Sequence, residues 1–394
     1  MAAFCIPSEL LDLRHSVRAF IEREVRPLEE RHHGQIREHG AIPHKIAVAE
    51  RRAIRKRAVE AGFYTMHLPE EIGGMGVPKL GMALVNEAIA ASGLSLAELG
   101  AIVPNVEGPT EVLLGCDEEQ RQRYLYPLMR AERETCFALS EPEAGSDATN
   151  IRTRAERDGD HWIINGRKHF ITNGQHADFI QLFATTKPGL GANGGITFFL
   201  VDADLPGVTV SNVQHTLGVD RPAELTFEGV RVPASGIVGE VGYGFRAAMS
   251  WINGGRLNIA ALALGKAQYL FERMVGYAKQ REAFGQPIGR FQFVQNLVVD
   301  SAVEIRMVRN LVYEAADALD GGAVDARELA ATAKLAATEM VGRVADRAIQ
   351  VHGGSGLTAE LEIERFYRDV RAMRIYEGTS EILRGTIART LGLA

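Results

Sequence analysis

The sequence has few cysteines, no long apolar run and no excess of basic residues. Its 394 residues include three cysteines, Cys5, Cys116 and Cys136, which are too few and too scattered for a disulfide scaffold, and the odd number favours a reducing compartment. No window approaches the ~18 consecutive apolar residues of a membrane-spanning helix. There are 44 Lys and Arg against 50 Asp and Glu, a formal net charge of −6, which disfavours a nucleic-acid-binding protein.

Several familiar catalytic and targeting signals are also missing. The sequence has no H-E-x-x-H, C-x-x-C, P-loop or G-x-S-x-G motif, so none of these catalytic classes is indicated. The eleven histidines show no spacing typical of metal ligands, and we expect no metal site. Glu9, Asp12, Arg14 and Arg18 interrupt any apolar stretch near the beginning, so we expect no signal peptide and a cytoplasmic enzyme.

Composition and periodicity indicate an α+β protein with several domains. Hydrophobic residues make up 46% and charged residues 24%, as in an ordinary globular protein, and this length corresponds to roughly two to three domains. The spacing of apolar residues divides the chain into a helical domain (1–131), a compact β domain (132–242) and a second helical domain (243–394).

In the first domain, apolar residues recur at helical spacing over 10–28, and Pro27 is expected to kink or end this helix. The polar, histidine-rich stretch His32–His44 is interpreted as a loop. A second helix is predicted over 50–62. Its basic run, 51–57, is expected to be a solvated helix face, which is the usual meaning of such a charge run.

In the middle domain, short β-rich runs are separated by glycine and proline. The runs 161–164 and 168–171 flank Asn165-Gly166-Arg167, and Asn-Gly between β-rich runs predicts a hairpin turn. Further strands are predicted over 179–185, 196–201, 208–213 and 224–232.

In the last domain, apolar residues follow a 3.6-residue period over 257–278, 305–319 and 333–351. Gly321-Gly322 separates the last two segments. Long helices with short loops between them predict an antiparallel bundle. The third segment is rich in alanine, which suits close packing between helices.

Four segments carry the most specific signal, and only their combination is specific. They are Cys136–Asp147, Lys168–Gly174, Tyr277–Gln295 and Gln350–Ile382. In this order, and with this helix–β–helix layout, the set resembles the acyl-CoA dehydrogenase family, and the resemblance covers nearly the whole chain. It implies an N-terminal α-helical domain, a central β-barrel-like domain and a C-terminal four-helix bundle.

The resemblance also implies an activity and partners. It implies FAD as cofactor, 2,3-dehydrogenation of a fatty or amino-acid-derived acyl-CoA, and electron transfer to an electron-transfer flavoprotein. It further implies a homotetramer built as a dimer of dimers, with no nucleic acid and no membrane as partner. Asn253–Arg256 is similar to the matching stretch of isobutyryl-CoA dehydrogenases, which favours a short or branched acyl chain.

Glu377, in the motif Ile-Tyr-Glu-Gly-Thr-Ser-Glu, is the candidate base. An α-proton of a thioester is very weakly acidic, so its removal needs a carboxylate whose proton affinity is raised by burial. Taken alone, a glutamate is more often a solvated surface carboxylate; this motif favours the catalytic role. In one branch of the family the base lies at the position of Gly255, and glycine cannot accept a proton. Arg256 matches an arginine that helps position the base, although an ion pair at a helix start would equally explain it.

The resemblance assigns further contacts residue by residue. Cofactor contacts are assigned to Phe137, Leu139, Ser140, Gly145, Ser146, Phe170, Ile171, Thr172, Arg281, Phe284, Gln292, Gln350, Gly353, Gly354, Thr379 and Glu381. Substrate contacts are assigned to Ser146, Asn253, Arg256, Tyr376, Glu377 and Gly378. In the family the set from Arg281 to Gly354 comes from a neighbouring subunit. The Thr172 hydroxyl is expected to donate to flavin N5. Phe170 stands where most similar members have Trp, and its other interpretation is a core residue of a strand.

Other functions remain open on the sequence alone. A flavoprotein of the same fold that reacts with oxygen, as an oxidase or monooxygenase, is the main alternative. A nitroalkane-oxidising relative would use Asp as its base, and a DNA-associated relative would need a basic groove and an extra domain. A helical scaffold without cofactor is the remaining interpretation, and it predicts a colourless protein.

Overall fold

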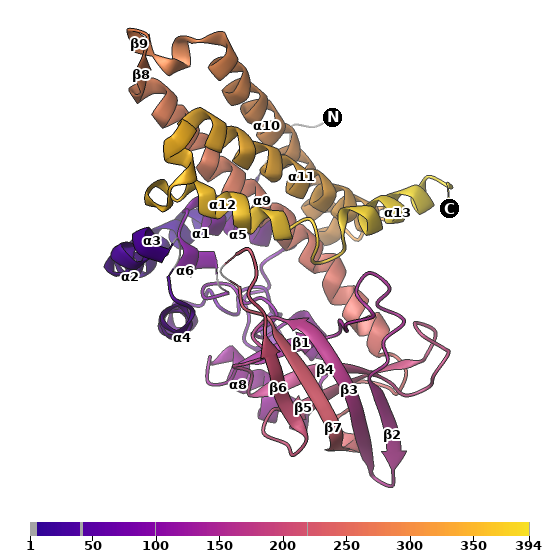
Figure 1. The fold of residues 1–394 in the computed structure, drawn as a ribbon. Helices are drawn as coiled ribbons and strands as arrows, with labels where there is room; N and C mark the ends of the chain where they lie inside the picture. Colours follow the sequence, from indigo (N-terminus) through magenta and orange to yellow (C-terminus); the bar gives the residue numbers. More distant parts are fainter. Residues whose placement is uncertain (1–5, 40–41, 99, 219, 394) are drawn as a thin grey trace.

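The computed structural model describes residues 6–39, 42–98, 100–218 and 220–393. Figure 1 shows the seven-stranded sheet at one end of the molecule and the long helices of the C-terminal region at the other. The predicted order of a helical, a β and a second helical domain is confirmed. In the part of the chain that the model describes, no helix is both long and apolar enough to cross a membrane.

The N-terminal region is built from helices. They are α1 (Ser8–Phe20), α2 (Arg26–Arg31), α3 (His33–His39), α4 (His44–Glu60), α5 (Lys79–Ala91), α6 (Ser95–Glu98), α7 (Glu118–Gln120) and α8 (Tyr126–Met129). A π-helical turn, Ile21–Val25, separates α1 from α2 just before Pro27, as expected where proline removes a backbone donor. The loop predicted over His32–His44 is wrong, because α3 occupies most of it. Ile36 is buried in the N-terminal core, and such packing stabilises a short helix that polar composition alone would not indicate. Residues 40–41 of this stretch lie outside the described residues.

The middle region is a twisted sheet. Its strands are β1 (Thr135–Ala138), β2 (Arg154–Asp158), β3 (His161–Ile171), β4 (Phe179–Thr185), β5 (Ile196–Asp202), β6 (Val208–Val213) and β7 (Ala223–Pro233). The order is β1-β4-β2-β3-β7-β6, with β5 paired to β4. The β1–β4 pair is parallel, whereas β2–β3, β3–β7, β4–β5 and β6–β7 are antiparallel.

The hairpin predicted at Asn165-Gly166 is wrong, because β3 runs straight through it. β7 pairs with β3 on both sides of this point, with a shift in register between Ile164 and Gly166. The Asn165 side chain accepts a hydrogen bond from the Gly229 backbone N–H (2.7 Å) instead of closing a turn. A Cβ at position 166 would lie 2.6 Å from the Cα of Thr153, so glycine serves here for close approach of a neighbouring segment.

The C-terminal region is a bundle of long helices. They are α9 (Gly244–Gln280), α10 (Gln292–Asp320), α11 (Ala326–His352), α12 (Ile363–Ala372) and α13 (Ser380–Thr390), with a small hairpin of β8 (Glu282–Ala283) and β9 (Gln286–Pro287) between α9 and α10. One hydrophobic core joins α9, α10, α11 and α12 and also takes in α5. A second core joins the start of α9 to β4, β5 and the segment around Leu113 and Leu125. These shared cores fix the sheet and the bundle relative to each other.

Candidate active site

The loop between α12 and α13 carries Glu377. Glu377 and Gly378 both have positive φ, +54° and +92°, a conformation that glycine adopts freely and that costs other residues about 1 kcal/mol or more. The Thr379 hydroxyl accepts a hydrogen bond from the Ile382 N–H (3.2 Å) and so caps α13. Ser380 is the first helical residue and instead donates to Glu339 (2.8 Å).

Two cations hold this loop in its unusual conformation. The ammonium of Lys334, on α11, donates to the backbone oxygens of Tyr376 (2.9 Å) and Gly378 (2.7 Å). The Arg256 Nε donates to the backbone oxygen of Glu377 at 3.5 Å. Arg256 lies in the middle of α9, which begins at Gly244, so the ion pair at a helix start considered for it is wrong.

Sequence reasoning missed Lys334. The pattern around it predicts only an alanine-rich helix that suits close packing. The residue has no exposed surface, like Ala330, Ala333 and Ala337 around it. The sequence signal that could have indicated its role is a single lysine on the buried face of an alanine-rich helix. A buried ammonium must be hydrogen-bonded, so such a lysine indicates polar partners inside the protein.

One oxygen of the Glu377 carboxyl group is buried without a hydrogen-bond partner in the described chain, although the residue as a whole is only partly buried. Its Oε2 atom is inaccessible to solvent and makes no hydrogen bond in the described part of the chain. Burial raises the pKa of this carboxyl from its ordinary 4.5 to about 7, and the positive charges of Lys334 and Arg256 oppose the rise. A carboxylate with a pKa near neutrality is suited to accept a proton from a weak carbon acid.

Gly255 of α9 packs directly against this carboxyl group. A Cβ at position 255 would lie 3.2 Å from the Glu377 Oε2, so the absence of a side chain on α9 makes room for the base. One turn earlier, Trp251 stacks on Phe137 of β1, with ring centroids 5.0 Å apart. Asn253 accepts a hydrogen bond from Arg256 (3.2 Å). The structure therefore brings β1, α9 and the Glu377 loop together.

The two β-domain stretches with predicted cofactor contacts are joined by a buried ion pair. Lys168 donates to the Leu139 backbone oxygen (2.9 Å) and to Glu141 (2.8 Å), and the His169 N–H donates to the Ser140 oxygen (2.9 Å). Burial lowers the pKa of Lys168 to about 8, while Glu141 opposes this shift. The pair therefore fixes the Ser140 segment to the end of β3.

The end of β3 presents an aromatic ring and a hydroxyl. Phe170 has φ +56° at a shift in the β3–β7 register and is 62% exposed, so its interpretation as a core residue is wrong. The Thr172 hydroxyl donates to Asp220 (3.0 Å) in this structure. The side chains of Leu139 and Ile171 are buried in hydrophobic cores, so only their backbone can meet a ligand.

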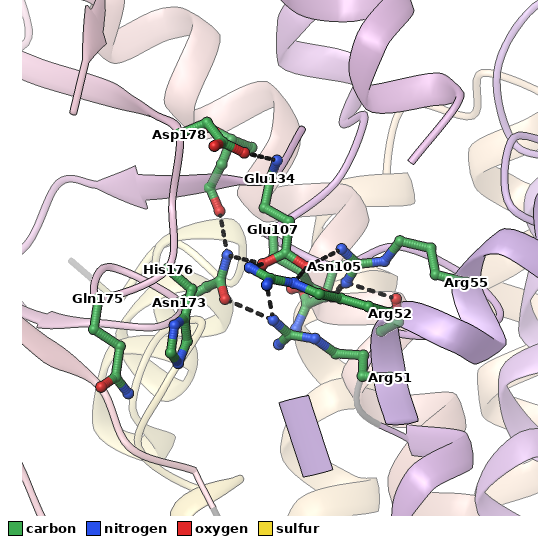
Figure 2. Close-up of polar contacts among 12 residues, drawn as sticks. Arg51, Arg52, Arg55, Asn105, Glu107, Glu134, Asn173, Gln175, His176 and Asp178 are labelled. Carbon is green, nitrogen blue, oxygen red and sulfur yellow. Dashed lines mark hydrogen bonds and ion pairs between the residues drawn. The ribbon is translucent and has the colours of Figure 1, made fainter. Parts of the chain in front are cut away.

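A buried charged network fastens the following turn to α4 (Figure 2). Arg51 donates to Asn173 (2.7 Å) and to Glu134 (3.1 Å), and Arg55 donates to Glu134 (2.7 Å). Asn173 has φ +63°. The solvated helix face predicted for 51–57 is therefore wrong for Arg51 and Arg55, which are buried, and right for Arg52, whose side chain is 53% exposed.

The remaining predicted cofactor residues lie elsewhere. Arg281, Phe284, Gln292, Gln350, Gly353 and Gly354 gather where α9 ends, α10 begins and α11 ends. A tilted contact between the rings of Tyr277 and His352 (centroids 4.4 Å apart) joins these helix ends, and Figure 1 shows this end of the bundle opposite the sheet. All six are exposed. Gly145, Ser146 and Glu381 are also exposed, on the loop after β1 and in the first turn of α13.

Three family models match this chain. They are the acyl-CoA dehydrogenase N-terminal domain (residues 7–132), middle domain (136–230) and C-terminal domain (242–392). The chain is 36% identical over 390 residues to "Probable acyl-CoA dehydrogenase FadE25" of Mycobacterium tuberculosis, covering 98% of this chain and 96% of that protein. The structure of butyryl-CoA dehydrogenase from Megasphaera elsdenii matches with a TM-score of 0.86 and 31% identity over 99% of both chains.

A solved structure described as an FAD complex of PigA matches with a TM-score of 0.88 and 27% identity over 99% of both chains. In the part of the chain that the model describes, no three or more His, Cys, Asp or Glu residues are grouped so as to hold a metal ion. The three family models together span nearly the whole chain, and the relatives match over almost their full length. The chain therefore belongs to the acyl-CoA dehydrogenase family of flavoprotein oxidoreductases.

Proposed function

We propose that this protein binds FAD and an acyl-CoA thioester and converts the acyl-CoA to the trans-2-enoyl-CoA, with Glu377 as the base. The observation that carries the proposal is the Glu377 carboxyl, whose Oε2 atom is buried without a hydrogen-bond partner in the described chain and whose pKa is raised to about 7 by burial. A glutamate on a surface would instead be solvated and paired with water.

The residues on the sheet side of the site fit FAD. An exposed aromatic ring at Phe170, beside the hydroxyls of Thr172 and Ser140, suits a flat ring system with polar edges. A Cβ at Gly145 would meet open space, so the backbone there is accessible. Bound FAD supplies the acceptor for the hydride that leaves the β-carbon.

The chain's own groups handle the proton and the thioester oxygen. The Glu377 carboxylate takes the α-proton, and the charges of Lys334 and Arg256 lower its pKa and so keep part of it ionised at neutral pH. The backbone N–H of Glu377 has no acceptor in the described chain; it is proposed to donate to the thioester oxygen, where negative charge develops. Ser146, Asn253, Tyr376 and Gly378 are proposed to contact the substrate.

The substitution Glu377→Gln tests this assignment. We expect the variant to keep its flavin, seen as yellow colour and visible absorbance, and to lose dehydrogenation of acyl-CoA in a dye-linked assay. Glu228→Gln, a change at an exposed residue of β7, is the matched control and should keep full activity. Turnover retained in Glu377→Gln would contradict the proposal, and a colourless wild-type protein would favour the scaffold interpretation.

The substrate is proposed to be a short or branched acyl-CoA, and the acceptor an electron-transfer flavoprotein. Gly255 leaves α9 without a side chain next to the base, and a similar solved structure is named a butyryl-CoA dehydrogenase. A panel of acyl-CoA esters of increasing length should give the highest kcat/KM with short or branched acyl chains. Rapid oxygen consumption with substrate would instead indicate the oxidase alternative, which the named relatives do not favour.

We also propose a homotetramer. On α10, Phe293, Val299, Val303 and Met307 are exposed and lie within about a third of the helix circumference. Phe284, at the tip of the β8–β9 hairpin, is 95% exposed. A second copy of the chain covering this apolar face would also bring Arg281 and the predicted cofactor residues around it to the cofactor of the neighbouring subunit. Light scattering should give four times the mass of one chain, and Met307→Lys should lower it.

A further inference from the structure

Lys334 is a buried ammonium that, within the described residues, donates only to backbone oxygens. It has no exposed surface, and no described carboxylate oxygen lies within 4.0 Å of its Nζ. Its hydrogen bonds go to Tyr376 (2.9 Å) and Gly378 (2.7 Å), the residues on either side of Glu377. Burying a charge is costly unless it is well hydrogen-bonded, so this placement needs an explanation beyond packing.

The two hydrogen bonds fix how the neighbouring peptide units are turned. All peptide bonds here are trans, and in a trans peptide the C=O of one residue and the N–H of the next point in opposite directions. Because the Tyr376 oxygen is held toward Lys334 on α11, the Glu377 N–H points away from α11. This N–H makes no hydrogen bond in the described chain, so it is a free donor beside the Glu377 carboxyl.

The same contacts support the positive φ of Glu377. Nothing about a glutamate favours φ +54°, so the surrounding contacts must hold it there. Lys334 holds the carbonyl before and the carbonyl after this residue. The ammonium also polarises the Tyr376–Glu377 peptide, which makes its N–H a stronger donor, since hydrogen bonds in a chain reinforce one another.

We propose that Lys334 is a positioning residue that aims the Glu377 N–H at the thioester oxygen while the Glu377 side chain takes the α-proton. The proposal rests on the function proposed above. One buried lysine thus sets the orientation of two groups: the N–H donor that stabilises the enolate and the carboxylate base that creates it. The α-proton goes to the Glu377 carboxylate and the C–H electron pair becomes the enolate, whose oxygen accepts the hydrogen bond.

A purely structural role for Lys334 is the competing explanation, and Glu339 offers a matched control. Glu339, also on α11, ties the ends of the same loop through Ser380 (2.8 Å) and Arg374 (2.7 Å). It touches neither peptide unit beside Glu377. Glu339→Gln therefore loosens the loop without releasing the two carbonyls that Lys334 holds.

The test uses the flavin-loaded enzyme and a 3-thia-acyl-CoA labelled with ¹³C at the thioester carbonyl. This analogue has sulfur in place of the β-carbon, so it can lose an α-proton but no hydride. Exchange of the α-hydrogen in D₂O is followed by NMR, and the carbonyl stretch of the bound analogue by infrared difference spectroscopy. The stretch reports the hydrogen bond to the thioester oxygen directly.

We expect Lys334→Met to slow α-hydrogen exchange by at least roughly tenfold, since loss of an oxyanion donor costs roughly a hundredfold or more. Its carbonyl stretch should move toward the frequency of the free thioester, while Glu339→Gln leaves the stretch unchanged. Exchange in Lys334→Met within twofold of the parent, with the same stretch, would overturn the proposal. If Lys334→Met does not fold, as judged by circular dichroism and flavin content, Lys334→Gln is measured in its place with the same expectations.

Glu377→Gln separates this proposal from the proposed function. It should abolish exchange yet keep the shifted carbonyl stretch, because its backbone N–H is retained. Exchange that persists in Glu377→Gln would refute Glu377 as the base, whatever Lys334 does. Exchange lost in Glu377→Gln and unchanged in Lys334→Met would refute the role of Lys334 alone.

Discussion

Removing the candidate base should make the protein more stable, and the gain should depend on pH. Burial raises the pKa of Glu377 from its ordinary 4.5 to about 7 in the folded state, so between these values the folded state binds more protons than the unfolded state. The free energy of unfolding therefore falls as pH rises through this window. The penalty is absent below pH 4.5 and complete above pH 7. Glutamine at this position carries no such penalty.

The size of the gain follows from the pKa difference. One pKa unit corresponds to 1.36 kcal/mol, so Glu377→Gln should gain up to about 3 kcal/mol above pH 7. This figure already includes the attraction between Glu377 and the buried ammonium of Lys334, because that attraction is one of the causes that set the pKa. Shifts at other carboxyl groups are common to both proteins and cancel in the comparison.

The assay is urea unfolding of both proteins at several pH values between 5 and 8, at one fixed FAD concentration because ligand binding adds to apparent stability. The midpoint of Glu377→Gln should exceed that of the parent at pH 8, and the difference should shrink toward pH 5. Glu228→Gln should match the parent throughout. Equal midpoints at pH 8, or a difference that grows toward acid pH, would refute a buried carboxyl with a raised pKa.

Three further substitutions test the contact beneath the base and the two buried groups of ion pairs. Gly255→Ala should lower kcat roughly tenfold by displacing the base, since small misplacements are costly, with flavin content unchanged; unchanged kcat would contradict the close contact. Lys168→Met leaves Glu141 buried without its partner and should lower the free energy of unfolding by roughly 3–5 kcal/mol in urea titrations. Arg52→Met should cost clearly less in the same titrations, because Arg52 is half exposed and Glu134 keeps the buried Arg51 and Arg55; a larger loss than for Lys168→Met would contradict the shared network.

Local patterns predicted most of the fold. The strand over Phe179–Thr185 was predicted from its apolar run and is observed with the same bounds, because a strand buried on both faces is apolar throughout. The long C-terminal helices follow a clear 3.6-residue period. Asn165-Gly166 misled because a turn signal describes only local preference, whereas pairing with β7 keeps β3 extended.

The candidate site was predictable only where a motif identifies it. Glu377 was located from its motif, but neither its burial nor its packing against Gly255 follows from spacing, since both depend on how α9 meets the α12–α13 loop. Arg51 and Arg55 were read as solvated because their partner Glu134 lies far along the chain. The partners of Lys334 also lie far along the chain, and they are backbone oxygens, which no residue type in the sequence identifies.

The missing side chain at position 255 has a consequence for how this sequence can diverge. A Cβ at position 255 would crowd the carboxyl group of the base, so position 255 cannot gain a side chain without displacing Glu377. Among descendants of this protein, the two should therefore vary together. A lineage that acquires a larger residue at 255 should have lost the glutamate at 377 or moved its chemistry to the helix.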